Sequence, residues 1–304
     1  MIARLPLVCI VALQFGGVAA CGTGEQNAAL FGGSDEGGPP EFTAVYEDIP
    51  PEPRVPERCE IGRTGVYDEE TLQDVVDLGC EALGGELMIS GEQRYPIASL
   101  GDTRAFWGTI SAFGGRGGWL TTASGFEQLE IGSGSIDLEG LNPLDGRLSF
   151  ARMKWWGDTD VTRSDYVAEL HLSRRIIPAT GSTRGKNRVN VASMPELRTL
   201  TMCAHGCEAI DLRLSRLPQL RTLEVGPVLQ VGPLVLEGLG AVESLAPLDS
   251  VIEVHSSVRF VDLRLVRRCE IERWLQQRRD WGTLFVEESE ITIENVSELP
   301  CDEI

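Results

Sequence analysis

Apolar residues separated by a single position recur along the chain, with the period of a strand that buries one face. The pairs are Leu87/Ile89, Leu129/Ile131, Leu148/Phe150, Leu170/Leu172, Leu200/Met202, Leu223/Val225 and Ile252/Val254. Successive pairs lie 42, 19, 22, 30, 23 and 29 residues apart. Because 42 is twice 21, and the apolar stretch 106–110 lies where a missing strand would fall, the pattern predicts one strand roughly every 20–23 residues.

This spacing predicts a mainly β solenoid, in which each turn of the chain adds one strand to a parallel sheet. A sandwich would show strands about every 8–12 residues, with turn signals between them. A doubly wound α/β fold would need a periodic helix in each gap, and gaps such as 132–143 contain too much Gly and Pro for one. The solenoid is therefore favoured over both.

Two of the predicted coils share residue identities as well as spacing. MPELRTLTM at 194–202 and LPQLRTLEV at 217–225 resemble degenerate leucine-rich repeats. With the cysteines at 59 and 80 and the closing helix after Cys269, the chain is similar to the receptor L-domain, a leucine-rich-repeat-like solenoid with disulfide-tied ends. The Asn that usually supports each turn is missing from most coils. The resemblance implies recognition of a protein or saccharide ligand and carries no catalytic residues.

Two amphipathic helices are expected to cap the solenoid. Near 68–78, Asp68 can act as the N-cap, an apolar stripe at positions 72, 75 and 76 follows, and Gly79 stops the helix. Near 270–279, an apolar face at positions 271, 274 and 275 lies among charged residues. The folded domain is therefore predicted to span 58–304.

The N-terminus has the layout of a secretory signal peptide at 1–20, with an apolar run too short to span a bilayer. Val18-Ala19-Ala20-Cys21 resembles the lipobox of bacterial lipoproteins, which implies lipidation of Cys21 and a membrane anchor. Gly22, where retained lipoproteins often have Asp, indicates the outer membrane by the same analogy. Residues 21–57 are rich in Gly, Pro and acids and predict a flexible, disordered tether.

Six cysteines remain after the signal peptide and Cys21 are set aside, which suits an oxidising compartment. They allow fifteen connectivities, and the sequence alone does not choose among them. Pairing by proximity would join Cys59 to Cys80, Cys203 to Cys207, and Cys269 to Cys301.

Charge narrows the class of partner. The net charge of −19 disfavours nucleic acids, whose phosphates such a surface repels. Against this background, the stretch 174–188 is unusually basic and is predicted to be an inserted loop that could contact an anionic partner. Its cations are Arg174, Arg175, Arg184, Lys186 and Arg188.

Trp155 and Trp156 are further candidate contacts, because strand alternation should turn at least one indole outward, where it could stack on a sugar or anchor a protein. Both could equally fill gaps in the core.

Catalytic and metal signals are weak. TGSTRGKN at 180–187 lacks the first Gly and the metal-binding Ser or Thr of a phosphate-binding loop. CAHGC at 203–207 offers three of the four ligands that a structural zinc needs, so we expect a disulfide and no metal or cofactor. The leading hypothesis is a lipid-anchored, non-catalytic recognition domain of the cell envelope. The alternative is a secreted β-helical enzyme acting on polysaccharide.

Overall fold

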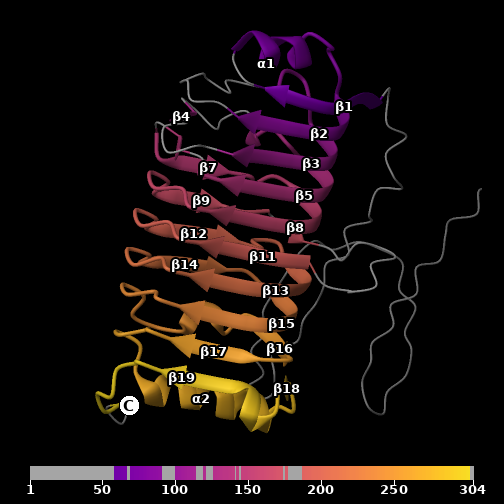
Figure 1. Ribbon diagram of the computed structural model, residues 1–304. Coiled ribbons are helices and arrows are strands. Elements are labelled where there is room, and N and C mark those ends of the chain that lie inside the picture. The colour runs from indigo at the N-terminus through magenta and orange to yellow at the C-terminus, as the bar shows by residue number, and fades with distance from the viewer. Residues whose placement is uncertain are drawn as a thin grey trace, which may run out of the picture.

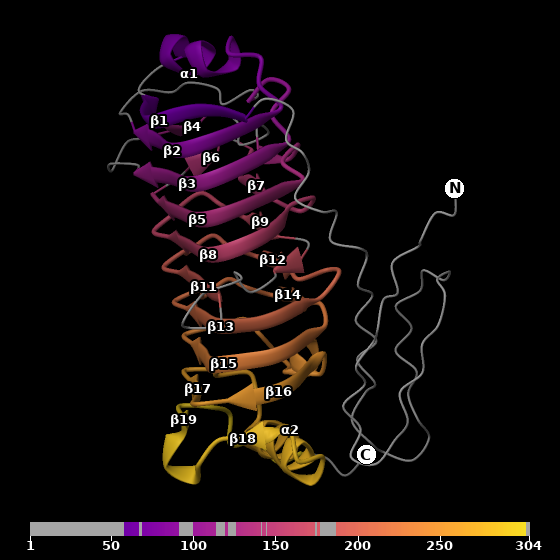
Figure 2. The same cartoon turned by 90° about the vertical axis from the view of Figure 1, so that its right-hand side faces the viewer.

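The computed structural model describes residues 58–301, apart from 67–68, 91–99, 114–118, 121–125, 141, 144, 174 and 177–186. Within this part of the chain, parallel strands coil into an elongated solenoid with one α-helix at each end (Figures 1 and 2). The predicted fold class, a mainly β solenoid with short capping helices, is confirmed. The predicted lipidation site Cys21 and the tether lie outside the described residues.

One large sheet of 13 strands runs along the whole solenoid, and all its pairings are parallel. Its strands up to the middle of the molecule are β1 (Arg58–Val66), β2 (Ala82–Ser90), β3 (Ala105–Phe113), β5 (Ile131–Glu139), β8 (Lys154–Thr162), β10 (Arg175–Ile176) and β11 (Asn187–Ala192). The rest are β13 (Cys207–Ser215), β15 (Val228–Glu237), β16 (Val251–His255), β17 (Val258–Val261), β18 (Leu284–Phe285) and β19 (Ile291–Glu294).

A smaller parallel sheet forms another side of the coils in the middle of the solenoid. It contains β7 (Arg147–Ser149), β9 (Glu169–His171), β12 (Thr199–Met202) and β14 (Thr222–Val225). Leu148, Leu170, Leu200 and Leu223 stack in register across it. Two-residue strands β4 (Trp119–Leu120) and β6 (Asn142–Pro143) pair separately, and short 3-10 turns lie at Ala246–Leu248 (η2) and Glu288–Glu290 (η3).

The apolar pairs found in the sequence therefore belong to two sheets and not to one. Those at 148, 170, 200 and 223 start in the small sheet, whereas those at 87 and 252 lie in the large one. The Gly-rich gap 132–143 holds most of β5, a nine-residue strand of the large sheet. The prediction that it is not helical is right, but its strand was missed because glycines interrupt the alternation.

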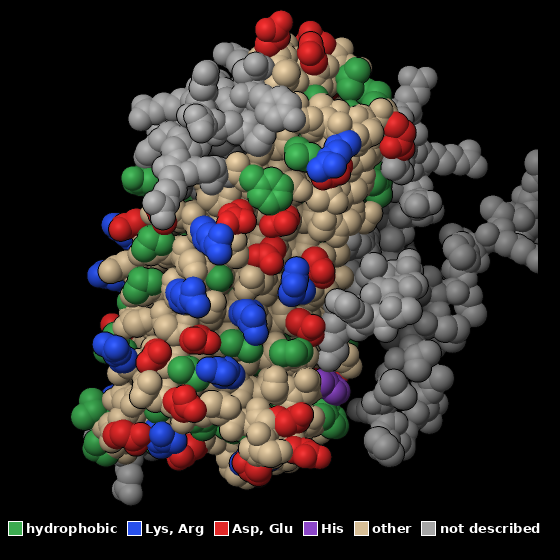
Figure 3. Space-filling view, in the orientation of Figure 1, with side chains coloured by type: hydrophobic (Ala, Val, Ile, Leu, Met, Phe, Trp, Pro, Cys, Tyr) green, Lys and Arg blue, Asp and Glu red, His purple; other side chains and the backbone are tan. Residues whose placement is uncertain are grey.

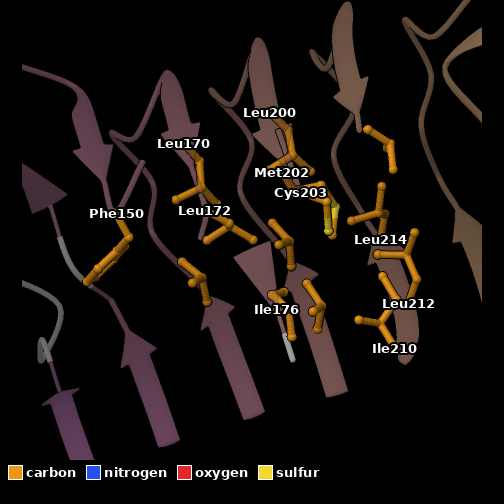
Figure 4. Close-up of a cluster of buried hydrophobic side chains, with 14 of the residues drawn as sticks. Phe150, Leu170, Leu172, Ile176, Leu200, Met202, Cys203, Ile210, Leu212 and Leu214 are labelled. Atoms are coloured by element: carbon orange, nitrogen blue, oxygen red, sulfur yellow. The ribbon is translucent and has the colours of Figure 1, made fainter. Parts of the chain in front are cut away.

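Two columns of inward-pointing side chains run through the large sheet. We call them the inner columns. The first contains Thr64, Leu87, Ile110, Ile136, Thr159, Val189, Leu212, Leu234, Val258 and Ile291. The second contains Val66, Ile89, Ala112, Leu138, Val161, Val191, Leu214, Leu236, Phe260 and Ile293. Side chains of the small sheet face them across the interior, as Leu200 and Met202 face Leu212 and Leu214 (Figure 4). The core is continuous and mainly aliphatic.

The two repeated motifs bury alternate side chains and turn the others outward. Leu200 and Met202 are fully buried, and Leu223 and Val225 are nearly so. Between them, Thr201 and Glu224 point outward, and the Thr201 hydroxyl donates a hydrogen bond of 3.1 Å to the Glu224 carboxylate. The two motifs are neighbouring coils of one scaffold.

A column of five glycines bends the first long strands. Gly62, Gly85, Gly108, Gly134 and Gly157 are in register on β1, β2, β3, β5 and β8. At Gly134 the backbone has φ +127°, and a Cβ built there would lie 1.8 Å from the carbonyl oxygen of Gly108. A side chain is therefore excluded at this bend by both conformation and space.

Helices α1 (Glu69–Val76) and α2 (Arg268–Asp280) close the two ends of the solenoid, as predicted. Leu72 and Val75 of α1 are buried, and Ile271, Trp274 and Leu275 of α2 are buried. Gly79, just past α1, has φ +62°, which fits the predicted stop signal; the predicted N-cap, residue 68, lies outside the described part.

One arginine of α2 is buried between the helix and the last coils. Arg278 is fully enclosed and donates from Nη2 to the carbonyls of Leu248 and Val251, at 2.9 and 3.0 Å. Its guanidinium lies 3.7 Å from the centre of the Trp274 ring. Burial lowers the pKa of Arg278 to about 10, and Asp249 partly opposes this shift. Arg278 thus satisfies two carbonyl groups just before the point where β16 begins to pair with β18.

Candidate recognition surface

All three disulfides expected from proximity are present. They join Cys59 to Cys80, Cys203 to Cys207, and Cys269 to Cys301, with Cα separations of 6.1, 5.4 and 6.2 Å. The first ties β1 to the turn after α1, and the last ties α2 to the end of the described chain. Three disulfides indicate an extracytoplasmic location. Both sulfurs of CAHGC are consumed by one of these bonds and are not thiolate ligands.

A column of polar side chains runs across the outward face of the large sheet. Asp137 on β5, Asp160 on β8, Asn190 on β11 and Arg213 on β13 occupy directly opposed positions. We call these four residues the charged column. Neighbouring strands of a sheet lie about 4.8 Å apart, so the column spans roughly 14 Å from Asp137 to Arg213. Acidic and basic side chains are interspersed over this face (Figure 3).

Hydrogen bonds fix the middle of the charged column. The Asn190 side-chain amide donates to the Asp160 carboxylate at 2.9 Å, and Arg188 lies 3.5 Å from the same group. The backbone N–H of Arg188 also donates to the carboxylate of Asp158 at 2.8 Å. Asp160 is therefore held in one orientation by an amide and a cation.

Asp137 has a different environment from Asp160. Among the described residues, its carboxyl accepts no hydrogen bond and joins no ion pair. Partial burial raises the pKa of Asp137, and the nearby carboxylates of Asp160 and Glu139 raise it further, whereas Arg188 opposes them. Glu139 itself is paired with Arg163. Of the carboxyls of Asp137, Glu139 and Asp160, that of Asp137 alone forms no ion pair with a described cation.

Arg213 lies at the other end of the column. Its side chain is exposed and makes no hydrogen bond or ion pair with the residues that the structure describes. An unpaired acid and an unpaired base are therefore displayed on one rigid sheet face. A partner with the opposite arrangement of charges could satisfy both.

The tryptophan prediction is corrected for one residue. Trp155 is fully buried, and its indole lies against Gly132 of the next strand, where a Cβ would meet the ring at 2.5 Å. Trp155 therefore packs in the core and does not present an outward contact. The side chain of Trp156 lies outside the described part, so the prediction that one indole faces outward stays a prediction.

The predicted basic loop is described only at its two borders, in β10 (Arg175–Ile176) and at the start of β11. Arg174, Arg184 and Lys186 fall outside the described residues, as does the side chain of Arg175. Arg188 belongs to β11, where its cation is committed to Asp160. This arginine is therefore part of the sheet surface and is not a free loop cation.

The charged column was missed in the sequence, although a signal for it exists. Each of its members stands between two inward-pointing residues, in the triplets IDL at 136–138, TDV at 159–161, VNV at 189–191 and LRL at 212–214. TDV keeps a Thr at the first position, and this departure hides the alternation. Alignment of the triplets by coil would have placed the four polar residues side by side.

Comparison with known proteins gives no relatives: no family model, curated protein or solved structure matches the chain. Among the described residues, no helix is long and apolar enough to cross a membrane. The fold and its surface chemistry therefore carry the functional argument.

Proposed function

We propose that this protein is a lipid-anchored component of the cell envelope whose solenoid is a non-catalytic recognition domain. The anchor is the predicted lipid on Cys21, the tether is 21–57, and the outer membrane is the proposed location. The disulfides support an exported protein. The stacked coils and capped ends are consistent with the resemblance to receptor L-domains, whose members recognise proteins or saccharides.

The observation that carries this proposal is the charged column. Recognition by a rigid sheet needs side chains that are fixed in position and not already satisfied within the protein. Asp137 and Arg213 meet the second requirement, and the hydrogen-bonded pair between them meets the first. The predicted partner is a protein or saccharide of the envelope that presents complementary charge, and nucleic acid is disfavoured by the net charge of −19.

A pull-down from native envelope with the tagged full chain tests the recognition function. We expect a specific partner to be retained by the wild type and lost with the double reversal Asp137→Lys and Arg213→Glu. The matched control is Asp74→Lys with Arg221→Glu, which makes the same charge changes on other exposed positions. Equal retention by both double variants would refute the assignment of the site.

The anchor has its own test. Labelling of cells with a palmitate analogue should tag the wild type and not Cys21→Ala. Equal labelling of both would refute the lipid anchor and would leave the recognition proposal for the solenoid standing.

A second candidate function, a polysaccharide-degrading enzyme, is favoured by one observation. Asp137 and Asp160 are direct neighbours on β5 and β8, and their environments differ, since one is hydrogen-bonded and paired while the other has a raised pKa. Two carboxyls in unlike environments can serve as general acid and base. Release of reducing ends from a panel of acidic and neutral polysaccharides by the wild type, and its loss in Asp137→Asn, would establish this alternative.

A further inference from the structure

The two ends of the inner columns are closed to different degrees. At the N-terminal end, Val66 begins the second column and is fully buried, with the buried face of α1 beside it. At the C-terminal end, Ile291 and Ile293 finish the two columns and remain half-buried. At the N-terminal end the half-buried column residue is the polar Thr64, whereas at the C-terminal end both half-buried column residues are apolar.

A groove lies beside these two isoleucines. It has a volume of about 460 Å³ and is formed by α2 on one side and β19 on the other. Leu275, Ile291 and Ile293 supply its apolar surface. Its polar lining is Glu272, Arg273, Gln276 and Arg279 on the helix side and Glu288 on the other. Figure 2 shows β19 and α2 together at this end of the molecule.

The backbone beside the groove also has an unused edge. β19 pairs with β17 on one side, and among the described strands none pairs with its other side. Such an edge exposes a row of N–H and C=O groups that can accept a further strand. Apolar side chains, a groove and a free strand edge together are the elements of recognition by strand addition.

Charge identifies the kind of strand that fits. Exposed carboxylates flank β19, at Glu287, Glu288 and Glu290 before it and at Glu294 on its last position. Glu288 is paired with Arg279, and the others have no cationic partner among the described residues. A second copy of this end would bring the same carboxylates together and be repelled, whereas a segment with Lys or Arg at its ends would be attracted.

We propose that the groove between α2 and β19 binds an extended, basic segment of another protein, which adds to β19 as the next strand of the large sheet. Alternate apolar side chains of that segment cover Ile291 and Ile293 and so continue the two inner columns. Its basic ends meet the carboxylates that flank β19. This site is separate from the charged column, and the proposal does not depend on the function assigned to that surface.

A labelled peptide with the sequence KVTVTVK is the direct probe, measured by fluorescence anisotropy against the full, disulfide-intact chain. We expect saturable binding, and at least tenfold weaker binding of EVTVTVE, which has the same apolar pattern and acidic ends. Two N-methylated versions, each blocking one edge of the peptide, separate strand addition from simple charge attraction. Only one of them should lose binding, because only the edge that faces β19 must pair. Binding of both versions at the parent level would overturn the proposal.

Protein variants place the peptide on the molecule. The double variant Glu290→Lys with Glu294→Lys changes only exposed positions, and we expect at least a tenfold loss of peptide binding. Asp74→Lys on α1, at the opposite end of the solenoid, is the control and should bind as the wild type does. Ile293→Lys should abolish binding, provided that its thermal melting is cooperative. No binding of KVTVTVK to the wild type, or a dimer in light scattering that Ile293→Lys dissociates, would refute a basic partner at this groove.

Discussion

Replacement of Gly134 by alanine tests how tightly the coils of this solenoid stack. Gly134 lies in the glycine column, with Gly108 and Gly157 in register on the strands at either side. Its φ of +127° lies in a region that residues with a Cβ rarely adopt. The added methyl group would also meet the carbonyl oxygen of Gly108 at 1.8 Å, a backbone atom that cannot rotate away.

The expected cost has two parts. Backbone strain at such a φ is worth about 1–3 kcal/mol. Displacement of the neighbouring strand by an overpacked group costs about 1–3 kcal/mol more. The free energy of unfolding should therefore fall by roughly 2–6 kcal/mol, a large share of the stability of a typical domain.

Gly282 provides a matched control. It also has a positive φ, +69°, but an added Cβ would meet nothing within 4 Å. Gly282→Ala should therefore cost only the left-handed conformation, about 1–2 kcal/mol. The difference between the two alanine variants isolates the close approach of the coils from the conformational preference.

Urea denaturation of the oxidised protein, followed by circular dichroism, measures both variants. We expect the midpoint of Gly134→Ala to fall well below that of Gly282→Ala, with similar slopes. If the two variants lose the same free energy, the strands are not stacked as closely as the glycine column requires. That result would refute the packing argument even if both variants were destabilised.

Three further substitutions test separate features of the structure. The hydroxyl of Thr159 is buried in an inner column and has no hydrogen-bond partner among the described residues. Thr159→Val should therefore raise the free energy of unfolding by about 1 kcal/mol in urea titrations; a lower free energy of unfolding would contradict this. Because folding raises the pKa of Asp137, its ionisation costs stability; the cost begins as the pH rises above the unfolded-state value of 3.8 and is complete above the folded-state pKa. Asp137→Asn should therefore raise the free energy of unfolding by about 0.2–1 kcal/mol at pH 7. This increase should vanish towards pH 3, below the ordinary pKa of 3.8. An increase that does not depend on pH would show that ionisation of Asp137 is not its cause. Arg278→Met removes the donors to the carbonyls of Leu248 and Val251 and should lower thermal stability by about 2–4 kcal/mol, whereas an unchanged melting temperature would show that α2 alone closes this end.

The repeated motifs show what the sequence could predict. MPELRTL and LPQLRTL place Leu197 and Leu220 at the end of a tight turn, where their N–H groups donate to the carbonyls of Met194 and Leu217. Leu200 and Leu223 follow in the small sheet, and all four leucines point inward. The motif spacing of 23 residues reflects one full coil, so the repeat spacing was sufficient to predict a solenoid, and the apolar stripes of the two end segments were sufficient to predict both cap helices. Proximity was sufficient to pair the cysteines because each bridge closes a local loop.

The strands of the large sheet were harder to predict from the pattern of apolar residues. Its early strands bend at the glycine column, and the bend breaks the strict alternation that marks a strand. Later coils split the strand in two, as in β16 and β17; the pair Ile252/Val254 marked β16, whereas the four-residue β17 was missed. The charged column depends on this sheet, and its residues come from four different coils, which is why no local motif indicated it.

The step of the glycine column has a consequence for how such a protein can change in length. Three of its four intervals are 23 residues, from Gly62 to Gly85, Gly85 to Gly108, and Gly134 to Gly157. A duplication or deletion of one such block would restore every backbone pairing and leave both capped ends as they are. The distance between the ends would then change in increments of about 4.8 Å. The length of the solenoid can therefore change by whole coils while the surfaces at its two ends stay the same.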